Sequence, residues 1–177
     1  MTKAMNMWRA QRVRRWHCNP DLSETSDFID GHSARVAKLI LALGDGEASR
    51  QLIIAALIHD DGEHAVGDIA QPVKSWLRLN KPDTWAQIEA VEASALDATW
   101  SGAAVNCPSL DEAEGRWLKF ADRLDAFIWA ATHGARMDRN GWPEDRAWLR
   151  AESCWLGCED AVWAMLDDVN PPPQEAR

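Results

Sequence analysis

The sequence predicts an all-α protein with one domain of about six or seven helices. Apolar residues recur at intervals of three and four along most of the chain, which is the spacing of one helix face. No segment shows the apolar–polar alternation that is typical of a half-buried strand. A chain of 177 residues is long enough for a single hydrophobic core. We therefore expect residues 1–170 to form one domain and residues 171–177 to form a disordered, Pro-rich tail.

Capping residues and glycines set the bounds of the first helices. The basic N-terminus favours a helix that delivers Arg15 and Trp16 to a site; a mitochondrial presequence or a nucleic-acid-binding arm are the alternatives. A helix over residues 27–43 has one apolar face and ends at a glycine. Ser49 begins the next helix, which is apolar on every side over residues 52–58 and should run through the core.

Proline and capping-box signals predict the remaining helices. Pro72 suits the first turn of one helix, and Pro143 begins the last one, which should continue to about Asp168. Two capping boxes open the helices between them. They are Thr84 with Gln87, for a helix to about residue 100, and Ser109 with Glu112, for a helix to about residue 133.

Composition excludes some classes of partner. Acidic residues outnumber basic ones by 28 to 19, so the net charge of −9 argues against a nucleic-acid polymer as partner. A small phosphate ligand stays compatible, because a metal and a few basic side chains reverse the field locally. The longest apolar run, residues 52–58, is far too short to span a membrane, so we expect no membrane partner. Cys154 and Cys158 are either free thiols or a pair of metal ligands.

Two histidines and two aspartates lie on three predicted helices that should pack in one core. They are His32, His59, Asp60 and Asp122. The His–Asp pair ends the core helix, where the helix dipole favours a cation. Each residue also has a simpler interpretation: the first histidine as a hydrogen-bonded core residue, and Asp122 as the partner of Arg123 or Lys119 in an ion pair.

Residues 59–74 read HDDGEHAVGDIAQPVK. This run resembles the H-D-x-x-E-x-x-x-G-D-x-x-x-P-V-K signature of the 5′-deoxynucleotidase branch of the HD-domain metal phosphohydrolases. The upstream Arg15–Trp16 pair, the Gly31–His32–Ser33 step and residues 119–122 (KFAD) match that branch as well. The related phage dATP triphosphohydrolases share these elements and have a similar length. The resemblance covers roughly residues 12–130 and implies an HD-domain helical bundle.

The resemblance also implies a role for each motif residue. His32, His59, Asp60 and Asp122 would hold one divalent transition metal, and this donor set suits Co²⁺, Zn²⁺, Mn²⁺ or Fe²⁺. Glu63 would be the catalytic residue that exchanges a proton with the attacking water or the leaving oxygen; its alternative is a solvated loop acid. Six residues are candidates for substrate binding. They are Arg15, Lys74 and Lys119 for phosphate, Asp68 for the sugar 3′-hydroxyl, Trp16 against a 2′-hydroxyl, and Pro72 beside the base.

These implications define the expected function. We expect a metal-dependent phosphohydrolase of deoxynucleotides, acting as a 5′-deoxynucleotidase on the monophosphate or as a triphosphohydrolase on dATP. A triphosphate would need further cations, such as Lys119, Arg116 or Arg123, near the metal. The alternative function is a non-catalytic or regulatory HD-fold module that binds nucleotides. By the same resemblance, we expect a homo-oligomer (a dimer or a hexamer) in the cytoplasm of a bacterial cell or a phage-infected host.

Overall fold

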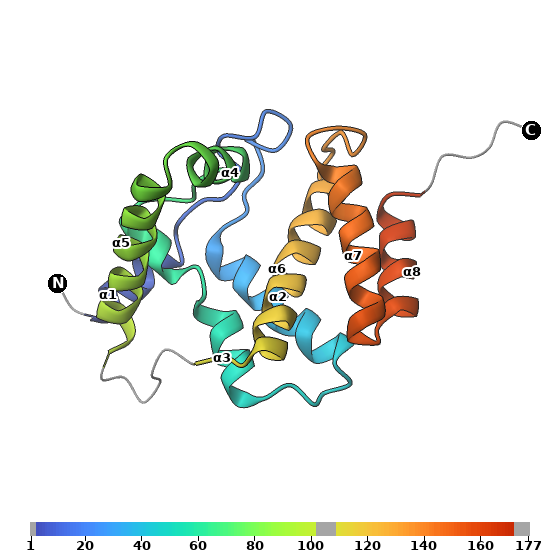
Figure 1. The fold of residues 1–177 in the computed structure, drawn as a ribbon, viewed down its shortest axis with the longest axis horizontal. Helices are drawn as coiled ribbons and strands as arrows, with labels where there is room; N and C mark the ends of the chain where they lie inside the picture. Colours follow the sequence, from blue (N-terminus) through green and yellow to red (C-terminus); the bar gives the residue numbers. More distant parts are fainter. Residues whose placement is uncertain (1–2, 102–108, 172–177) are drawn as a thin grey trace, which may run out of the picture.

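The regular structure of the chain is helical throughout the part that the computed structural model describes, which is residues 3–101 and 109–171. Figure 1 shows the arrangement. The elements are α1 (Lys3–Ala10), α2 (Ile29–Leu43), α3 (Arg50–Ile58), the 3₁₀ helix η1 (Asp61–Ala65), α4 (Gln71–Asn80), α5 (Pro82–Trp100), α6 (Glu112–Thr132), α7 (Trp142–Leu156) and α8 (Glu159–Val169). The all-α class is confirmed, with no strand in the described segments. Of the expected tail, residues 172–177 lie outside the described residues.

Helix α6 contributes to both parts of the hydrophobic core, because two of its faces are buried. One face places Phe120, Leu124 and Phe127 against apolar residues of α7 and α8. The other places Ala121 against Val36 of α2 and neighbouring residues of α3. Figure 1 shows α6 crossing α2, with the α7–α8 pair beside it. The helices that carry His32, His59 and Asp122 are thus packed around one another.

The 3₁₀ helix η1 packs closely on α5, and this contact fixes the segment that follows α3. A Cβ atom at Gly62 would lie 2.4 Å from the backbone oxygen of Glu92, so only glycine fits there. Helices α1 and α4 pack beside α5 at the same end of the molecule (Figure 1). The residues just after His59 are therefore buried between elements and not in an open loop.

The helix starts agree only in part with the predicted caps. The Ser49 side chain accepts a hydrogen bond from Leu52 N at 3.0 Å, which confirms the predicted start of α3. Helix α5 already begins at Pro82, so the Thr84–Gln87 box is wrong. The Ser109–Glu112 box is also wrong. The box at the start of α6 is Asp111 with Glu114, which has the same spacing two residues later.

The predicted last helix is two helices, α7 and α8. Gly157 separates them in the left-handed conformation, with φ at 73°, and Cys158 N bonds back to Ser153 O at 3.0 Å. The apolar spacing continues across this break, which is why a single helix was expected. Cys154 is exposed and Cys158 is buried, and both are free thiols. None of the helices in the described segments combines the length and hydropathy that a membrane span requires.

Candidate metal centre

Two imidazole nitrogens face the same space between α2, α3 and α6. His32 lies in the first turns of α2 and is fully buried, whereas His59 caps the C-terminus of α3 and is 15% exposed. Their ring centroids are 5.3 Å apart. Both Nε2 atoms are buried, and neither makes a hydrogen bond to any residue that the structure describes. Two buried ring nitrogens side by side without a hydrogen-bond partner require a physical explanation.

Two carboxylates approach these nitrogens. Asp122 Oδ1 is 3.1 Å from His32 Nε2, and Asp60 Oδ2 lies 3.5 Å from His32 Nε2 and 3.4 Å from His59 Nε2. Atoms of His32, His59 and Asp122 that are able to bind a metal all lie within 4.8 Å of one another. The four predicted ligand residues thus lie together, although the sequence spreads them over 91 positions.

The simpler interpretation, an ion pair of Asp122 with Arg123 or Lys119, is not what the structure has. Arg123 donates its hydrogen bond to Asp145 of α7. Lys119 is exposed, with Nζ 5.9 Å from the ring centroid of Trp148, also on α7. The ionisable groups close to the Asp122 carboxylate include His32 and His59.

The hydrogen bonds of both histidines select the tautomer that a metal ligand needs. His32 Nδ1 lies 2.7 Å from Asp125 Oδ2, and His59 Nδ1 lies 2.9 Å from the backbone oxygen of Ala56. A carboxylate and a carbonyl only accept, so each Nδ1 carries the hydrogen and donates it. When the rings are neutral, the Nε2 lone pairs therefore face the two carboxylates, as metal binding requires.

Sequence reasoning missed the polar network behind His32. Arg35 donates to Asp125 at 2.6 Å and to Asp27 at 2.8 Å, and Arg15 approaches the same two carboxylates at 3.6 and 3.4 Å. Asp27 and Asp125 are only 1% and 3% exposed. A signal was present, because Arg35 follows His32 by three residues and Asp125 follows Asp122 by three, which places each pair on one helix face.

The carboxylates favour positive charge at the centre of the cluster. Burial and the charge of Arg15 lower the pKa of His32, but the hydrogen bond to Asp125 and the nearby carboxylates of Asp122 and Asp60 outweigh them and raise it to about 10. Burial alone would raise the pKa of Asp122, yet the nearby imidazole of His32 and the charge of His59 hold that pKa below its usual value. The charge of His59 and the nearby His32 likewise outweigh the effect of burial and lower the pKa of Asp60.

Glu63 lies beside the cluster and is buried, with 6% of its surface exposed. It is on η1, where residues three apart lie on the same side, and its backbone N–H donates to Asp60 O at 2.9 Å. Lys74 of α4 donates from Nζ to Glu63 Oε1 at 3.1 Å. Burial and the nearby charge of Asp60 raise the pKa of Glu63 to about 8. Glu63 is therefore not the solvated loop acid of the alternative interpretation.

Arg15, Trp16 and Asp68 lie next to the polar network behind His32. The Arg15 guanidinium lies 5.1 Å from the Trp16 ring centroid, and the Trp16 backbone N–H donates to Asp68 Oδ2 at 3.3 Å. Trp16 has a left-handed backbone, with φ at 65°, and its Nε1–H donates to Asp27 Oδ2 at 3.0 Å. Its ring also packs on Trp142 of α7, so Trp16 takes part in the core as well.

The other two predicted substrate residues lie at the surface. Pro72 is exposed in the first turn of α4, two residues before Lys74. Lys119 is exposed on α6 and directed toward α7. No described hydrogen bond or ion pair joins either side chain to the cluster.

In comparisons with known proteins, no family model, no curated protein and no solved structure matched this chain. The chemistry therefore follows from the donor set itself. Two imidazole nitrogens and two carboxylate oxygens suit a divalent transition metal and select weakly among Co²⁺, Zn²⁺, Mn²⁺ and Fe²⁺. The Asp122 side chain is 42% exposed, so the cluster is open on this side to water and to small solutes.

Proposed function

We propose that the chain is a metal-dependent phosphohydrolase of deoxynucleotides, of the HD-domain type, with one divalent metal held by His32, His59, Asp60 and Asp122. The observation that carries the proposal is the convergence of two buried, unpartnered Nε2 atoms on two carboxylates. A metal bound there would supply a Lewis acid for a phosphate oxygen and would lower the pKa of a bound water.

The charge balance around the cluster supports a cation at this point. When the imidazoles are neutral, as metal binding requires, six carboxyl groups belong to the cluster and its hydrogen-bonded surroundings, against three basic side chains. The carboxylates are those of Asp27, Asp60, Glu63, Asp68, Asp122 and Asp125, and the basic side chains are those of Arg15, Arg35 and Lys74. A phosphate would be repelled by this excess of negative charge unless a cation offset it.

Neighbouring residues provide the remaining functions. Glu63 is held by Lys74 next to Asp60 and is the proposed group for proton exchange with the attacking water or the leaving oxygen. Arg15 and Lys74 offer their N–H groups to the phosphate. Asp68 and Trp16, joined by a hydrogen bond, are the proposed contacts for the deoxyribose.

Within this proposal, the arginines of α6 favour a monophosphate over a triphosphate. Arg116 donates to Glu152 and Arg123 donates to Asp145, so both guanidinium groups are already paired with acids of α7. A triphosphate carries further negative charge that these arginines would have to meet by breaking those pairs. A substrate with one phosphate makes no such demand.

The decisive experiment measures metal content and products together. The purified chain should contain or take up a transition metal, and with Co²⁺ or Mn²⁺ it should release inorganic phosphate from dAMP faster than it releases triphosphate from dATP. Asp60→Ala should lose metal and activity together, because it removes a ligand, whereas Asp168→Ala on the exposed surface of α8 should keep both.

Three results would count against parts of the proposal. Inertness toward dAMP and dATP, in a protein that binds metal, would reject the proposed substrates. If the purified protein contained no metal and its Tm did not change on addition of Co²⁺ or Mn²⁺, the non-catalytic module would be favoured. Preferential cleavage of dATP would reject the monophosphate. The homo-oligomer stays a prediction, and size-exclusion chromatography with light scattering tests it.

A further inference from the structure

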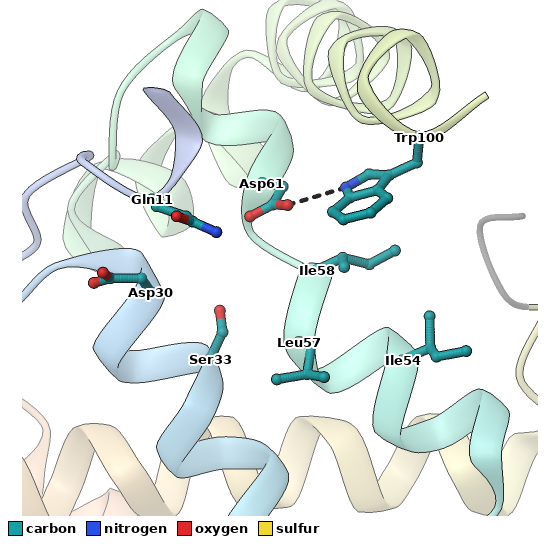
Figure 2. A pocket seen from close by; sticks show the side chains of 8 residues that line it. All are labelled: Gln11, Asp30, Ser33, Ile54, Leu57, Ile58, Asp61 and Trp100. Atoms are coloured by element: carbon teal, nitrogen blue, oxygen red, sulfur yellow. Dashed lines mark hydrogen bonds between the residues drawn. The ribbon is translucent and has the colours of Figure 1, made fainter. Parts of the chain in front are cut away.

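A cavity of about 300 Å³ lies beside the candidate metal centre but is lined by other side chains. It lies between α2, α3, the start of η1 and the end of α5 (Figure 2). Its volume is at the lower end of the range for small-molecule pockets. None of the four candidate metal ligands lines it, and neither does Glu63.

The first feature that points to a ligand is an unpartnered hydroxyl. Ser33 on α2 is 2% exposed, and its Oγ atom is buried with no hydrogen-bond partner among the described residues. Figure 2 shows this hydroxyl directed into the cavity. Buried hydroxyls in proteins almost always have a partner. A ligand in the cavity would provide one.

The second feature is a buried carboxylate on the opposite wall. Asp61 is 3% exposed, and one of its oxygens accepts a hydrogen bond from Trp100 Nε1 at 3.0 Å. The other oxygen makes no side-chain hydrogen bond in the described part of the chain and lies on the cavity side (Figure 2). Asp61 and Ser33 thus present two acceptors toward one space.

The charged residues that line the cavity disfavour the binding of an anion. Asp30 and Asp61 both line the cavity, and no lysine, arginine or histidine is among its described lining residues. A nucleotide phosphate would meet two carboxylates there with no basic group to offset them. The cavity is therefore not a second phosphate site, and its complement is a cation.

The remaining wall is apolar. Ile54, Leu57 and Ile58 of α3 line one side, and the Trp100 indole closes the end (Figure 2). Leu57 is 46% exposed at this site. A ligand that covers Leu57 would gain hydrophobic contact, and the indole face adds attraction for a cation.

From these features we infer a binding site for a small primary ammonium compound with one alkyl or aryl group. Its ammonium group donates hydrogen bonds to Ser33 Oγ and to the free oxygen of Asp61. Its apolar body lies against Ile54 and Leu57. The site is separate from the proposed hydrolysis and does not depend on it.

A probe series of equal size tests the inference directly. We would titrate benzylammonium, benzyl alcohol and benzoate into the full-length chain labelled with ¹⁵N at tryptophan. Excess EDTA is present throughout, because an amine also ligates transition metals. The Trp100 indole N–H, assigned with Trp100→Phe, reports on the cavity because it is bonded to Asp61. We expect a saturable shift with benzylammonium, a dissociation constant about tenfold higher for benzyl alcohol, and no shift with benzoate.

Variants at the cavity, each with a matched surface control, test where benzylammonium binds. Leu57→Lys puts a positive charge on an exposed position at the cavity and should abolish benzylammonium binding, whereas Leu79→Lys, on the exposed face of α4, should not change it. Asp61→Asn keeps an acceptor for Trp100 but loses the charge, and Ser33→Ala loses the hydroxyl. Each should weaken binding about tenfold, with Asp160→Asn and Ser75→Ala as surface controls.

Several results would overturn the inference. The site would be a purely apolar cavity if benzyl alcohol bound as tightly as benzylammonium. It would not be a ligand site if no probe shifted the Trp100 signal. If Leu57→Lys still bound benzylammonium, the ligand would bind elsewhere on the chain. This test does not depend on whether Ser33→Ala and Asp61→Asn fold.

Discussion

Asp125 accepts a hydrogen bond from His32 across a distance of 2.7 Å, in the fully buried contact between α6 and α2. The bond joins residues 93 positions apart and directs Nε2 of His32 toward Asp122 and Asp60. A carboxylate on the far nitrogen of a metal-binding imidazole fixes the ring and increases its basicity. Asp125 is thus a positioning residue for the proposed metal.

Asp125→Asn should weaken metal binding while leaving all four proposed ligands in place. The neutral amide no longer stabilises His32 as the carboxylate does, so we expect the affinity for Mn²⁺ or Co²⁺ to fall about 10- to 100-fold. Calorimetric titration of the metal measures this, with Asp168→Asn on the surface of α8 as the control. Unchanged affinity in Asp125→Asn would show that the bond to His32 has no such role.

Metal binding should release a proton and strengthen with pH. The pKa of His32 stands at about 10 in the chain without metal, so a metal has to displace the imidazolium proton. The affinity should rise about tenfold per pH unit for each proton released, between pH 6.5 and 9. Calorimetry in buffers of different ionisation enthalpy counts the protons. Affinity that is independent of pH over this range would contradict the raised pKa.

The raised pKa of His32 also determines how the stability of the metal-free chain changes with pH. The pKa of His32 is raised from its ordinary value of 6.5 to about 10, so the protonated ring stabilises the fold. That contribution is complete below about pH 6.5 and disappears as the pH rises through about 10. Urea unfolding in EDTA should show wild type losing more stability than His32→Gln over this range. Parallel losses in the two proteins would argue against it.

The helices were predictable because their signals are local. Ser49 and the apolar run after it predicted the start of α3. The break between α7 and α8 was missed because the apolar spacing continues through Gly157. A glycine inside a periodic segment has the same appearance in a sequence whether the helix continues or ends there.

The candidate site was predictable only where its residues form a motif. The four residues that meet at the two Nε2 atoms were named from the sequence, whereas Asp27, Arg35 and Asp125 were not. Their contacts join residues from three separate segments, and no local pattern encodes which acid faces which base. The cavity beside Ser33 was missed for the same reason, since its lining comes from five segments of the chain.

Replacing a glycine with alanine should lower the free energy of unfolding at Gly157 and raise it at Gly115. Gly157→Ala places a Cβ atom on a residue with φ at 73°, which costs about 1–2 kcal/mol of unfolding free energy. Gly115→Ala lies inside α6, where a Cβ atom meets nothing within 4 Å, and should gain about 0.5–1 kcal/mol. Urea unfolding measures both. A Gly157→Ala variant as stable as wild type would mean that α7 and α8 form one continuous helix.

Glu63→Gln should separate turnover from metal binding. The amide keeps the size of the side chain and can still accept from Lys74, but it cannot exchange a proton, so kcat on the preferred deoxynucleotide should fall about 10²- to 10⁴-fold. Metal content and Tm should stay close to those of wild type, because Glu63 is not among the four proposed ligands. Glu89→Gln, an exposed glutamate of α5, serves as the control and should leave kcat unchanged. If the Glu63→Gln protein hydrolyses substrate at the wild-type rate, another group transfers the proton, and the buried pair with Lys74 is purely structural.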